Sequence, residues 1–271
     1  MPRAIVKSRA IVLRRQRLGE TSKLVTLYTE EYGKLKVTAK GARRPRSKFG
    51  AALEPLTEVQ AVCYLRDERE LQILSDCDVV RQHPQLQADL ERLSFASAAC
   101  ELVDRLTVEG EANRRLYLCL SGVLTGLGEV TTEQVEPLFW YYQLRVAEAL
   151  GYRPELSRCV GCGAALGADW LWFGAEAGGA LCPGCGQGQG IRLAGESVRL
   201  LGRLQQIRGY TPEAIPAVPP RRGEIRAALR SFLEYHGGGR GRLRSLDFLE
   251  AVSGRDGSAA DHSSDAGVRH G

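Results

Sequence analysis

The amino-acid sequence predicts an α+β fold in which a small five-stranded β-barrel comes first and a helical bundle follows it. Residues 4–80 contain five short apolar segments, and the clearest of them alternate apolar and polar residues as strands do. From residue 84 to residue 150 the apolar residues instead recur every three or four positions, which is the period of a helix. Residues 157–190 interrupt this pattern with glycines and two pairs of cysteines, which indicates an inserted module.

The alternation is strict in one of the predicted strands. Leu35, Val37 and Ala39 fall on one face of residues 34–40, and lysines and a threonine fall on the other. Five strands of this length suit a small barrel or sandwich, and a barrel of the oligonucleotide-binding (OB) type is the natural candidate. We therefore expect residues 1–82 to form an OB-fold nucleic-acid-binding domain.

Three helical segments are expected after the barrel. The first begins at Pro84, which suits the first turn of a helix, and the third ends at Gly151. We expect residues 83–252 to form a helical domain that carries the insertion at residues 157–190. Residues 253–271 are small, polar and rich in glycine, which predicts a disordered tail.

The two CxxC pairs predict a metal site. Both have the form C-x-G-C-G, and 19 residues separate one pair from the other. Four thiolates in two pairs match the closed tetrahedral site of structural zinc, which leaves no position for water or substrate. The alternatives are an iron centre, a pair of disulfides and a redox-active CxxC, although a redox CxxC normally opens a helix in a βαβ unit. The expected Zn²⁺ ligands are Cys159, Cys162, Cys182 and Cys185.

Positive charge is concentrated near the N-terminus. Residues 1–50 hold 14 Lys/Arg and three Asp/Glu, a net charge of +11, so the rest of the +5 chain carries −6. Such a region is typical of a polyanion site, although a solvated basic face is the simpler alternative. Residues 40–48 continue the lysine face of the alternating strand, and such a surface binds phosphates with little dependence on sequence. The candidate binding residues are Arg14, Arg15, Lys34, Lys36, Lys40, Arg43, Arg44, Arg46 and Lys48.

Three aromatic residues accompany the basic segment: Tyr28, Tyr32 and Phe49. Their rings could stack on unpaired bases. Core packing or simple exposure is at least as good an interpretation of each of them.

Nothing in the sequence argues for catalysis. The chain has no GxxxxGK[ST], HExxH or GxSxG motif, and its four histidines are isolated from one another. No apolar run approaches the roughly 20 residues that cross a bilayer, and the N-terminus lacks the apolar core of a signal peptide. We therefore expect a cytoplasmic binding protein without a membrane association, and not an enzyme.

Several motifs resemble those of the bacterial RecO (recombination protein O) family. The most specific is Ala39-Lys40-Gly41-Ala42-Arg43-Arg44 with Ser47, and the similarity covers roughly residues 1–250. The other motifs are Gly19-Glu20-Thr21, residues 29–34 (TEEYGK), Leu53-Glu54-Pro55, residues 150–156 (LGYRPEL) leading into Cys159 and Cys162, and Arg244-Ser245 with Phe248-Leu249.

The resemblance implies an OB-fold, a helical domain and an inserted zinc ribbon in a non-enzymatic recombination mediator of the RecF pathway of DNA repair. Such proteins bind single- and double-stranded DNA, anneal complementary strands and help to load the recombinase RecA onto DNA coated by single-strand-binding protein (SSB). The implied partners are RecR and the acidic C-terminal tail of SSB, whose pocket should lie on the helical domain, and the implied location is the nucleoid in the cytoplasm. Some family members lack the cysteines, so the zinc is not expected to be essential to the shared activity.

Two other classes of function stay open. The chain could be a zinc-ribbon protein of transcription or RNA processing, with RNA or a polymerase as its partner. It could also be a hydrolase or transferase with an unrecognised site. Annealing of complementary strands distinguishes the repair mediator from both.

Overall fold

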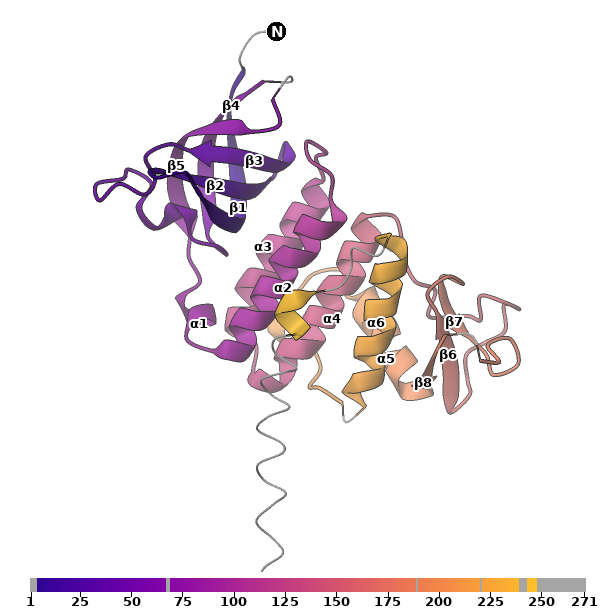
Figure 1. Cartoon of the computed structure of the whole chain (residues 1–271). Coiled ribbons are helices and arrows are strands. Elements are labelled where there is room, and N and C mark those ends of the chain that lie inside the picture. The colour runs from indigo at the N-terminus through magenta and orange to yellow at the C-terminus, as the bar shows by residue number, and fades with distance from the viewer. Residues whose placement is uncertain (1–3, 67–68, 189, 220, 239–242, 248–271) are drawn as a thin grey trace, which may run out of the picture.

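The computed structural model describes the chain in five stretches: residues 4–66, 69–188, 190–219, 221–238 and 243–247. A β-barrel lies at one end of the molecule and a small three-stranded sheet at the other, with the helices between them (Figure 1). The expected α+β fold is therefore confirmed. The expected tail, residues 253–271, lies outside the described residues.

The barrel has five strands and is closed, with the strand order β1-β2-β3-β5-β4. Neighbouring strands are antiparallel except β3 and β5, which are parallel. The first half of β1 pairs with β4 and the second half with β2, and a bulge between Val12 and Arg14 lets the strand bend from one partner to the other. This is the barrel expected of an OB-fold. The strands are β1 (Ala4–Leu18), β2 (Ser22–Thr29), β3 (Gly33–Ala39), β4 (Glu58–Leu65) and β5 (Gln72–Arg81).

The alternation expected in the third strand is present in β3. Leu35, Val37 and Ala39 are buried in the barrel core, whereas Lys36 and Thr38 on the outer face are partly exposed. Burying a large aliphatic side chain stabilises the fold by about 1.5–3 kcal/mol. A shift of one residue would bring the polar side chains inside, so this core fixes the register of the strand.

Several α-helices and two 3₁₀ turns follow or join these strands, and residues 244–247 are helical as well. Side chains define where the longer helices start: Asp89 and Asn113 each accept a hydrogen bond from the backbone N–H three residues later, and Thr131 and Gln134 form a capping box. None of these helices has the length and apolar character needed to span a bilayer. The elements are η1 (Gly50–Leu53), α1 (Pro84–Gln87), α2 (Leu90–Leu106), α3 (Arg114–Glu129), α4 (Thr132–Ala149), α5 (Gly195–Gln206), η2 (Pro212–Ala214) and α6 (Arg222–His236).

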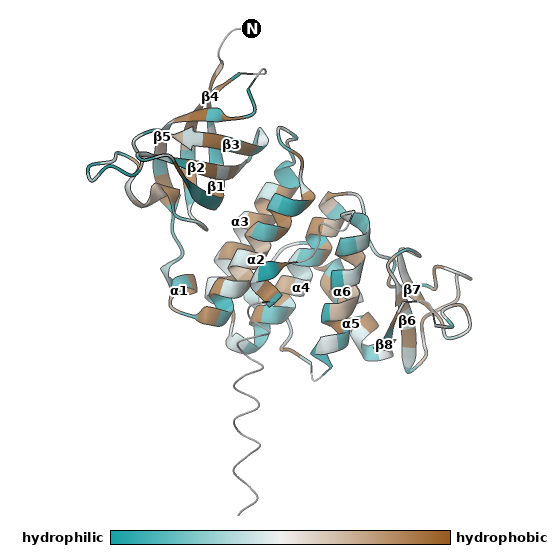
Figure 2. Ribbon diagram, in the orientation of Figure 1, coloured by the Kyte–Doolittle hydropathy of each residue, from teal (hydrophilic) through white to brown (hydrophobic). Residues whose placement is uncertain are grey.

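The helices enclose an aromatic core. Trp140 is almost fully buried, and the rings of Phe95 and Phe139 lie 5.3 Å apart. The buried hydroxyl of Tyr142 donates a hydrogen bond of 2.9 Å to the carbonyl oxygen of Ala99. Figure 2 shows apolar and polar residues alternating along the helices, as expected of amphipathic helices that bury one face.

The cysteine-rich insertion forms a small sheet with the order β7-β6-β8, which we call the ribbon together with its cysteine loops. Its strands are β6 (Trp170–Gly174), β7 (Gly179–Leu181) and β8 (Ile191–Ala194). Leu171, Phe173 and Leu193 belong to the same core as the helices, and the ring of Phe173 lies 5.8 Å from that of Phe232 in α6. The ribbon is therefore packed into the helical domain, and β8 leads directly into α5.

The barrel is fixed on the helices by both apolar and polar contacts. Ile11, Leu13 and Tyr28 on its outer face belong to the helical core and not to the barrel's own. Glu58 of β4 is completely buried, and its carboxylate accepts hydrogen bonds from Arg9 at 3.1 Å and from Ser121 of α3 at 2.6 Å. The outer face of the barrel thus completes the hydrophobic core of the helices, while the barrel interior forms a separate core of its own.

Candidate nucleic-acid interface and metal centre

The structure brings the four cysteines of the two CxxC pairs together. Their sulfur atoms all lie within 4.8 Å of one another, and the Sγ atoms of Cys162 and Cys182 are 3.8 Å apart. Cys159 is buried, Cys182 and Cys185 are partly exposed and Cys162 is exposed. This donor set could bind a metal ion that accepts four sulfur ligands.

Glycines allow the chain to curl tightly around the sulfur atoms. The backbone N–H of Gly163 donates to the carbonyl of Cys159 at 2.8 Å, and that of Gly186 donates to the carbonyl of Cys182 at 2.9 Å. Gly186 has no room for a side chain, because a Cβ there would lie 2.4 Å from the Cβ of Trp172. The two cysteine loops therefore share the same backbone hydrogen bond from the following glycine.

The electrostatics of the cluster favour a bound cation. A hydrogen bond of 3.3 Å from the Cys182 backbone N–H lowers the pKa of the Cys159 thiol to about 6. A hydrogen bond with Cys162 is the main cause that raises the pKa of the Cys185 thiol to about 12. Four sulfur atoms this close cannot all carry negative charge unless a cation lies between them.

The basic loop, residues 40–48, is largely exposed, and hydrogen bonds hold it in place. The backbone N–H of Arg43 donates to Thr21 at 3.0 Å and its guanidinium to the carbonyl of Gly19 at 2.8 Å, so the loop is held against the β1–β2 hairpin. A backbone turn follows, in which Ser47 N–H donates to Arg44 at 3.0 Å. Four exposed cations of the loop have no ion-pair partner among the described residues: Lys40, Arg43, Arg44 and Arg46. The fifth, Lys48, lies 3.8 Å from Asp76.

Three other candidate cations of the barrel are ion-paired. Arg15 pairs with Glu54 at 2.6 Å on the surface. Arg14 donates to the carboxylate of Asp104 in α2 at 2.7 Å. Lys36 lies 2.5 Å from Glu109, and its hydrogen bond with Glu109 raises the pKa of the lysine. The pairs of Arg14 and Lys36 join the barrel to the helical part of the chain, whereas the pair of Arg15 lies within the barrel.

The structure corrects the prediction for Lys34, which was expected on the exposed basic surface but is buried. Its ammonium group donates to the backbone carbonyls of Asp104 at 2.5 Å and Thr107 at 2.7 Å, and its own carbonyl accepts from Gly110 N–H at 3.0 Å. The outer face of β3 was expected to be open, but the end of α2 covers this position. Lys34 therefore joins the domains and does not contribute to an exposed basic face.

The aromatic residues near the basic segment are also part of the protein interior. Tyr28 is fully buried and Phe49 is 3% exposed, while Tyr32 packs against the barrel core. Neither Tyr28 nor Phe49 can stack on a base in this structure, so the core-packing interpretation is correct for both.

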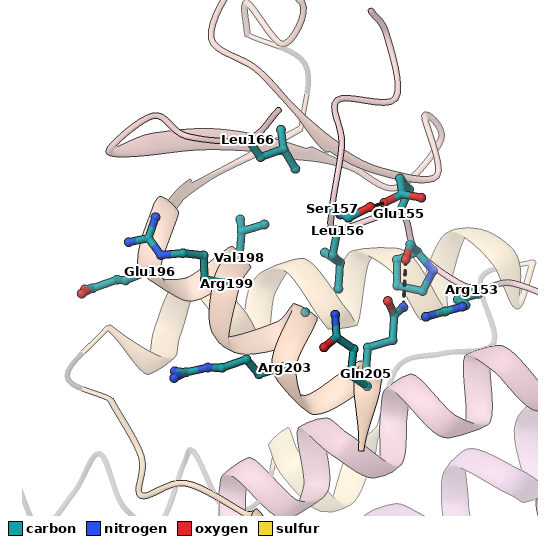
Figure 3. Close-up of a pocket in the computed structure, with 13 residues that line it drawn as sticks. Arg153, Glu155, Leu156, Ser157, Leu166, Glu196, Val198, Arg199, Arg203 and Gln205 are labelled. Atoms are coloured by element: carbon teal, nitrogen blue, oxygen red, sulfur yellow. Dashed lines mark hydrogen bonds between the residues drawn. The ribbon is translucent and has the colours of Figure 1, made fainter. Parts of the chain in front are cut away.

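The helical domain contains arginine-rich cavities that the sequence analysis missed. One of them, of about 670 Å³, lies between the ribbon and α5 and includes Arg153, Arg199 and Arg203 (Figure 3). Another, of about 270 Å³, lies between α3 and α4 and combines apolar side chains with Arg145 and Arg208. The only sequence signal for the first was the spacing of Arg199 and Arg203, which places them on one helix face.

Comparisons with known proteins identify the family. The family profile described as "Recombination protein O N terminal" matches residues 1–83, and "Recombination protein O C terminal" matches residues 87–247. These two profiles cover nearly all of the chain that the structure describes.

Curated relatives agree with the profiles. The chain is 36% identical over 239 residues to DNA repair protein RecO of Pelotomaculum thermopropionicum, covering 86% of this chain and 89% of the relative. It is 35% identical over 249 residues to that of Anaeromyxobacter sp. (strain K), covering 91% and 96%. It is 38% identical over 198 residues to that of Symbiobacterium thermophilum, covering 72% and 77%. The chain therefore belongs to the recombination protein O (RecO) family.

Proposed function

We propose that this protein is a recombination mediator of DNA repair that acts by binding DNA and not by catalysis. In this proposal it anneals complementary single strands and, together with RecR, helps to load RecA onto SSB-coated DNA in the RecF pathway. It would act at the nucleoid, in the cytoplasm. The observation that carries the proposal is an exposed loop of unpaired cations on a closed five-stranded barrel, in a chain of the RecO family.

The basic loop supplies the proposed DNA contact. Lys40, Arg43, Arg44 and Arg46 are exposed and free of ion pairs in the described stretches, so a phosphate need not displace a carboxylate to reach them. Contacts of this kind release counterions, which makes binding strongly dependent on salt and weakly dependent on sequence. Lys48, Arg15, Lys36 and Arg14 would extend the same surface once their ion pairs open.

The four cysteines would hold one structural Zn²⁺ ion. The donor set, the small distances among the sulfur atoms and the paired glycine-containing loops support zinc. With four sulfur ligands the ion would have no open position, so its role would be to stabilise the ribbon. We accordingly propose an OB-fold domain at residues 1–82 and a helical domain at residues 83–252 with the ribbon inserted.

The smaller cavity between α3 and α4 is the proposed site for the acidic C-terminal tail of SSB. It is lined by apolar and aromatic groups that include Leu118, Tyr141 and Tyr210, and Leu118 is 48% exposed. Arg145 lies 5.2 Å from the ring of Tyr141 and donates to the carbonyl of Gln205, so its position is fixed. An apolar pocket bordered by arginines suits a peptide that carries carboxylates beside a large apolar residue.

The decisive experiment is an annealing assay on complementary strands coated with SSB, with and without RecR. We expect the wild-type protein to accelerate annealing, and the triple variant Arg43→Glu/Arg44→Glu/Arg46→Glu to lose DNA affinity by about tenfold or more at moderate salt. The matched control, Arg43→Lys/Arg44→Lys/Arg46→Lys, keeps the charge and should keep most of the affinity. Unchanged DNA binding by the glutamate variant would reject the basic loop as the site, and preferential binding of RNA would favour the RNA-processing alternative.

A further inference from the structure

The cavity between the ribbon and α5 is part of a longer depression that we call the arginine groove. The cavity of about 670 Å³ adjoins one of about 480 Å³, with which it shares Glu196 and Arg199. It also adjoins one of about 750 Å³, with which it shares Arg153, Gln205 and Gln206. Eight arginines line the three cavities: Arg115, Arg145, Arg153, Arg192, Arg199, Arg203, Arg208 and Arg221.

Helix α5 forms one wall of the groove. Its inner face carries buried Leu201 and Leu204, so the helix is anchored in the core and its outer face is fixed in orientation. Arg199 and Arg203 lie on the outer face one turn apart, which places their stems roughly 6 Å from each other. Both guanidinium groups are therefore presented in a row along the groove.

The groove carries a net positive charge, because its eight arginines outnumber the five acids that line the same three cavities. Arg115, Arg153, Arg199, Arg203 and Arg208 are exposed and have no ion-pair partner in the parts of the chain that are described. Two of these acids are held in place by hydrogen bonds: Glu224 accepts from Ala194 N–H at 2.9 Å, and hydrogen bonds from Ser157 are the main cause that lowers the pKa of Glu155. Two acids pair with arginines inside the groove: Glu148 lies 2.5 Å from Arg145, and Glu196 lies 3.9 Å from Arg221.

The floor of the groove between the charges is apolar, with Leu166 partly exposed and Leu156 and Val198 buried. Figure 3 shows Leu156, Leu166 and Val198 pointing into the space between the ribbon and α5, with Arg199 and Arg203 on one side and Arg153 on the other. At the far end the guanidinium of Arg192 lies 4.3 Å from the ring centroid of Trp170. Arginine planes and apolar side chains are surfaces on which unpaired bases can lie while the arginines contact phosphates.

We propose that the arginine groove binds a single strand of nucleic acid, as a second strand site separate from the basic loop of the barrel. An acidic peptide would also complement the positive charge of the central cavity, the one of about 670 Å³. The row of unpaired arginines runs through three adjoining cavities, however, and such a length fits a repeating polyanion better than a short peptide segment. This inference rests on the proposed function, because annealing requires one protein to hold two strands.

The position of the groove would allow the protein to hold a second strand apart from the first. The barrel and the ribbon lie at opposite ends of the molecule with the helices between them, so two strands could be held at once without mutual exclusion (Figure 1). The cavity at one end of the groove shares Leu118, Cys119, Arg145 and Arg208 with the proposed pocket for the SSB tail. A strand leaving SSB would therefore enter the groove next to the point where SSB is tethered.

The test measures the number of strands bound as well as annealing. A fluorescent oligonucleotide of roughly 10 nucleotides should fill one site at a time, and titration of the full chain should reach two oligonucleotides per protein. The variant Arg199→Glu/Arg203→Glu should bind one, as should the barrel variant Arg43→Glu/Arg44→Glu/Arg46→Glu, and annealing by the groove variant should fall by about tenfold or more. The control Arg199→Lys/Arg203→Lys should retain two, and Glu196→Gln should tighten binding at the groove.

Several outcomes would overturn the second strand site, and one would separate it from the proposed function. A wild-type stoichiometry of one, or a stoichiometry of two that survives in the folded groove variant, would overturn the second site. An oligo-glutamate peptide that binds the groove while both oligonucleotides stay bound would assign the groove to an acidic partner protein and also overturn the proposal. If the wild type fails to anneal strands but the groove variant still loses one bound oligonucleotide, the proposed function fails and the groove stands as a strand site.

Discussion

The ammonium group of Lys34 caps the C-terminus of α2, where its Nζ donates a hydrogen bond of 2.7 Å to the carbonyl oxygen of Thr107. A second bond of 2.5 Å reaches the carbonyl of Asp104, and the Asp104 carboxylate lies 3.5 Å away. The last carbonyls of a helix have no partner within the helix and carry its negative dipole. A lysine of the barrel therefore completes a helix of the other domain.

Replacing Lys34 by methionine should destabilise the folded protein. The change leaves the two carbonyls in the domain interface without their donor, at a cost of about 1–3 kcal/mol per unsatisfied buried group. Thermal or urea unfolding would measure the loss. Lys40→Met is the matched control, since Lys40 is exposed and has no partner among the described residues, and its effect should stay within about 0.5 kcal/mol. Equal effects of the two substitutions would contradict the capping role.

Gly33, next to Lys34, should tolerate no side chain. Its φ is +64°, and a Cβ would lie 1.9 Å from the backbone oxygen of Glu111. Gly33→Ala should therefore cost clearly more than the roughly 1 kcal/mol of an alanine in the left-handed region, because backbone of the helical domain must move as well. Gly19→Ala provides the comparison, since Gly19 has nearly the same φ, +61°, but no atom within 4 Å of such a Cβ. Equal melting temperatures for the two variants would show that the domains are not in contact at this point.

Removing a cysteine of the cluster should affect stability more than DNA binding. Cys159→Ala or Cys182→Ala breaks the four-sulfur set, and the ribbon then loses the energy of metal binding that supports its few apolar contacts. We expect one zinc per chain by metal analysis, and a large fall in Tm for either variant. The DNA affinity of the fraction that stays folded should be close to that of the wild type. Loss of DNA binding at an unchanged Tm would assign the ribbon a direct part in binding.

The proposed tail pocket predicts a selective effect of one exposed side chain. Leu118→Asp places a carboxylate in the apolar part of the pocket and should weaken binding of an SSB tail peptide by about tenfold or more. Because Leu118 is already 48% exposed, the fold should be little affected. The matched control is Leu90→Asp, which changes a leucine that is 49% exposed on α2 and lies outside the cavity. A tail affinity that falls equally in both variants would argue against this pocket.

Acidification should destabilise the joint between the domains at His83. This side chain is 5% exposed, and burial is the main cause that lowers its pKa below the ordinary value of 6.5. The folded state then binds a proton less readily than the unfolded state, so stability is complete above about pH 6.5 and falls as the pH drops below that value. His83→Gln should reduce the slope of unfolding free energy against pH below about pH 6.5. An identical slope in the variant would show that other groups cause the acid sensitivity.

The sequence was sufficient where one local pattern determines the structure. Alternation in β3 predicted that Leu35, Val37 and Ala39 point into a barrel, because a shift of one residue would bury polar side chains. The repeated C-x-G-C-G form predicted that the four cysteines meet, and their sulfur atoms do. In both cases the residues that matter are neighbours in the chain or repeat a known geometry.

The sequence was insufficient where distant segments meet. Alternation placed Lys34 on the outer face of the barrel, but it could not show that α2, some 70 residues later, would cover that position. The arginine groove is built from Arg153 before the ribbon and from Arg199 and Arg203 after it. These arginines are scattered through a part of the chain that is acidic overall, so charge counting pointed only to the N-terminus.

The apolar outer face of the barrel affects whether the barrel can be produced as an isolated domain. Ile11, Leu13 and Tyr28 belong to the helical core, so the fragment 1–82 expressed alone would expose them to water. A contiguous apolar surface of this kind promotes aggregation. A soluble isolated barrel would therefore require polar replacements at these three positions, and the full-length chain would tolerate such replacements poorly.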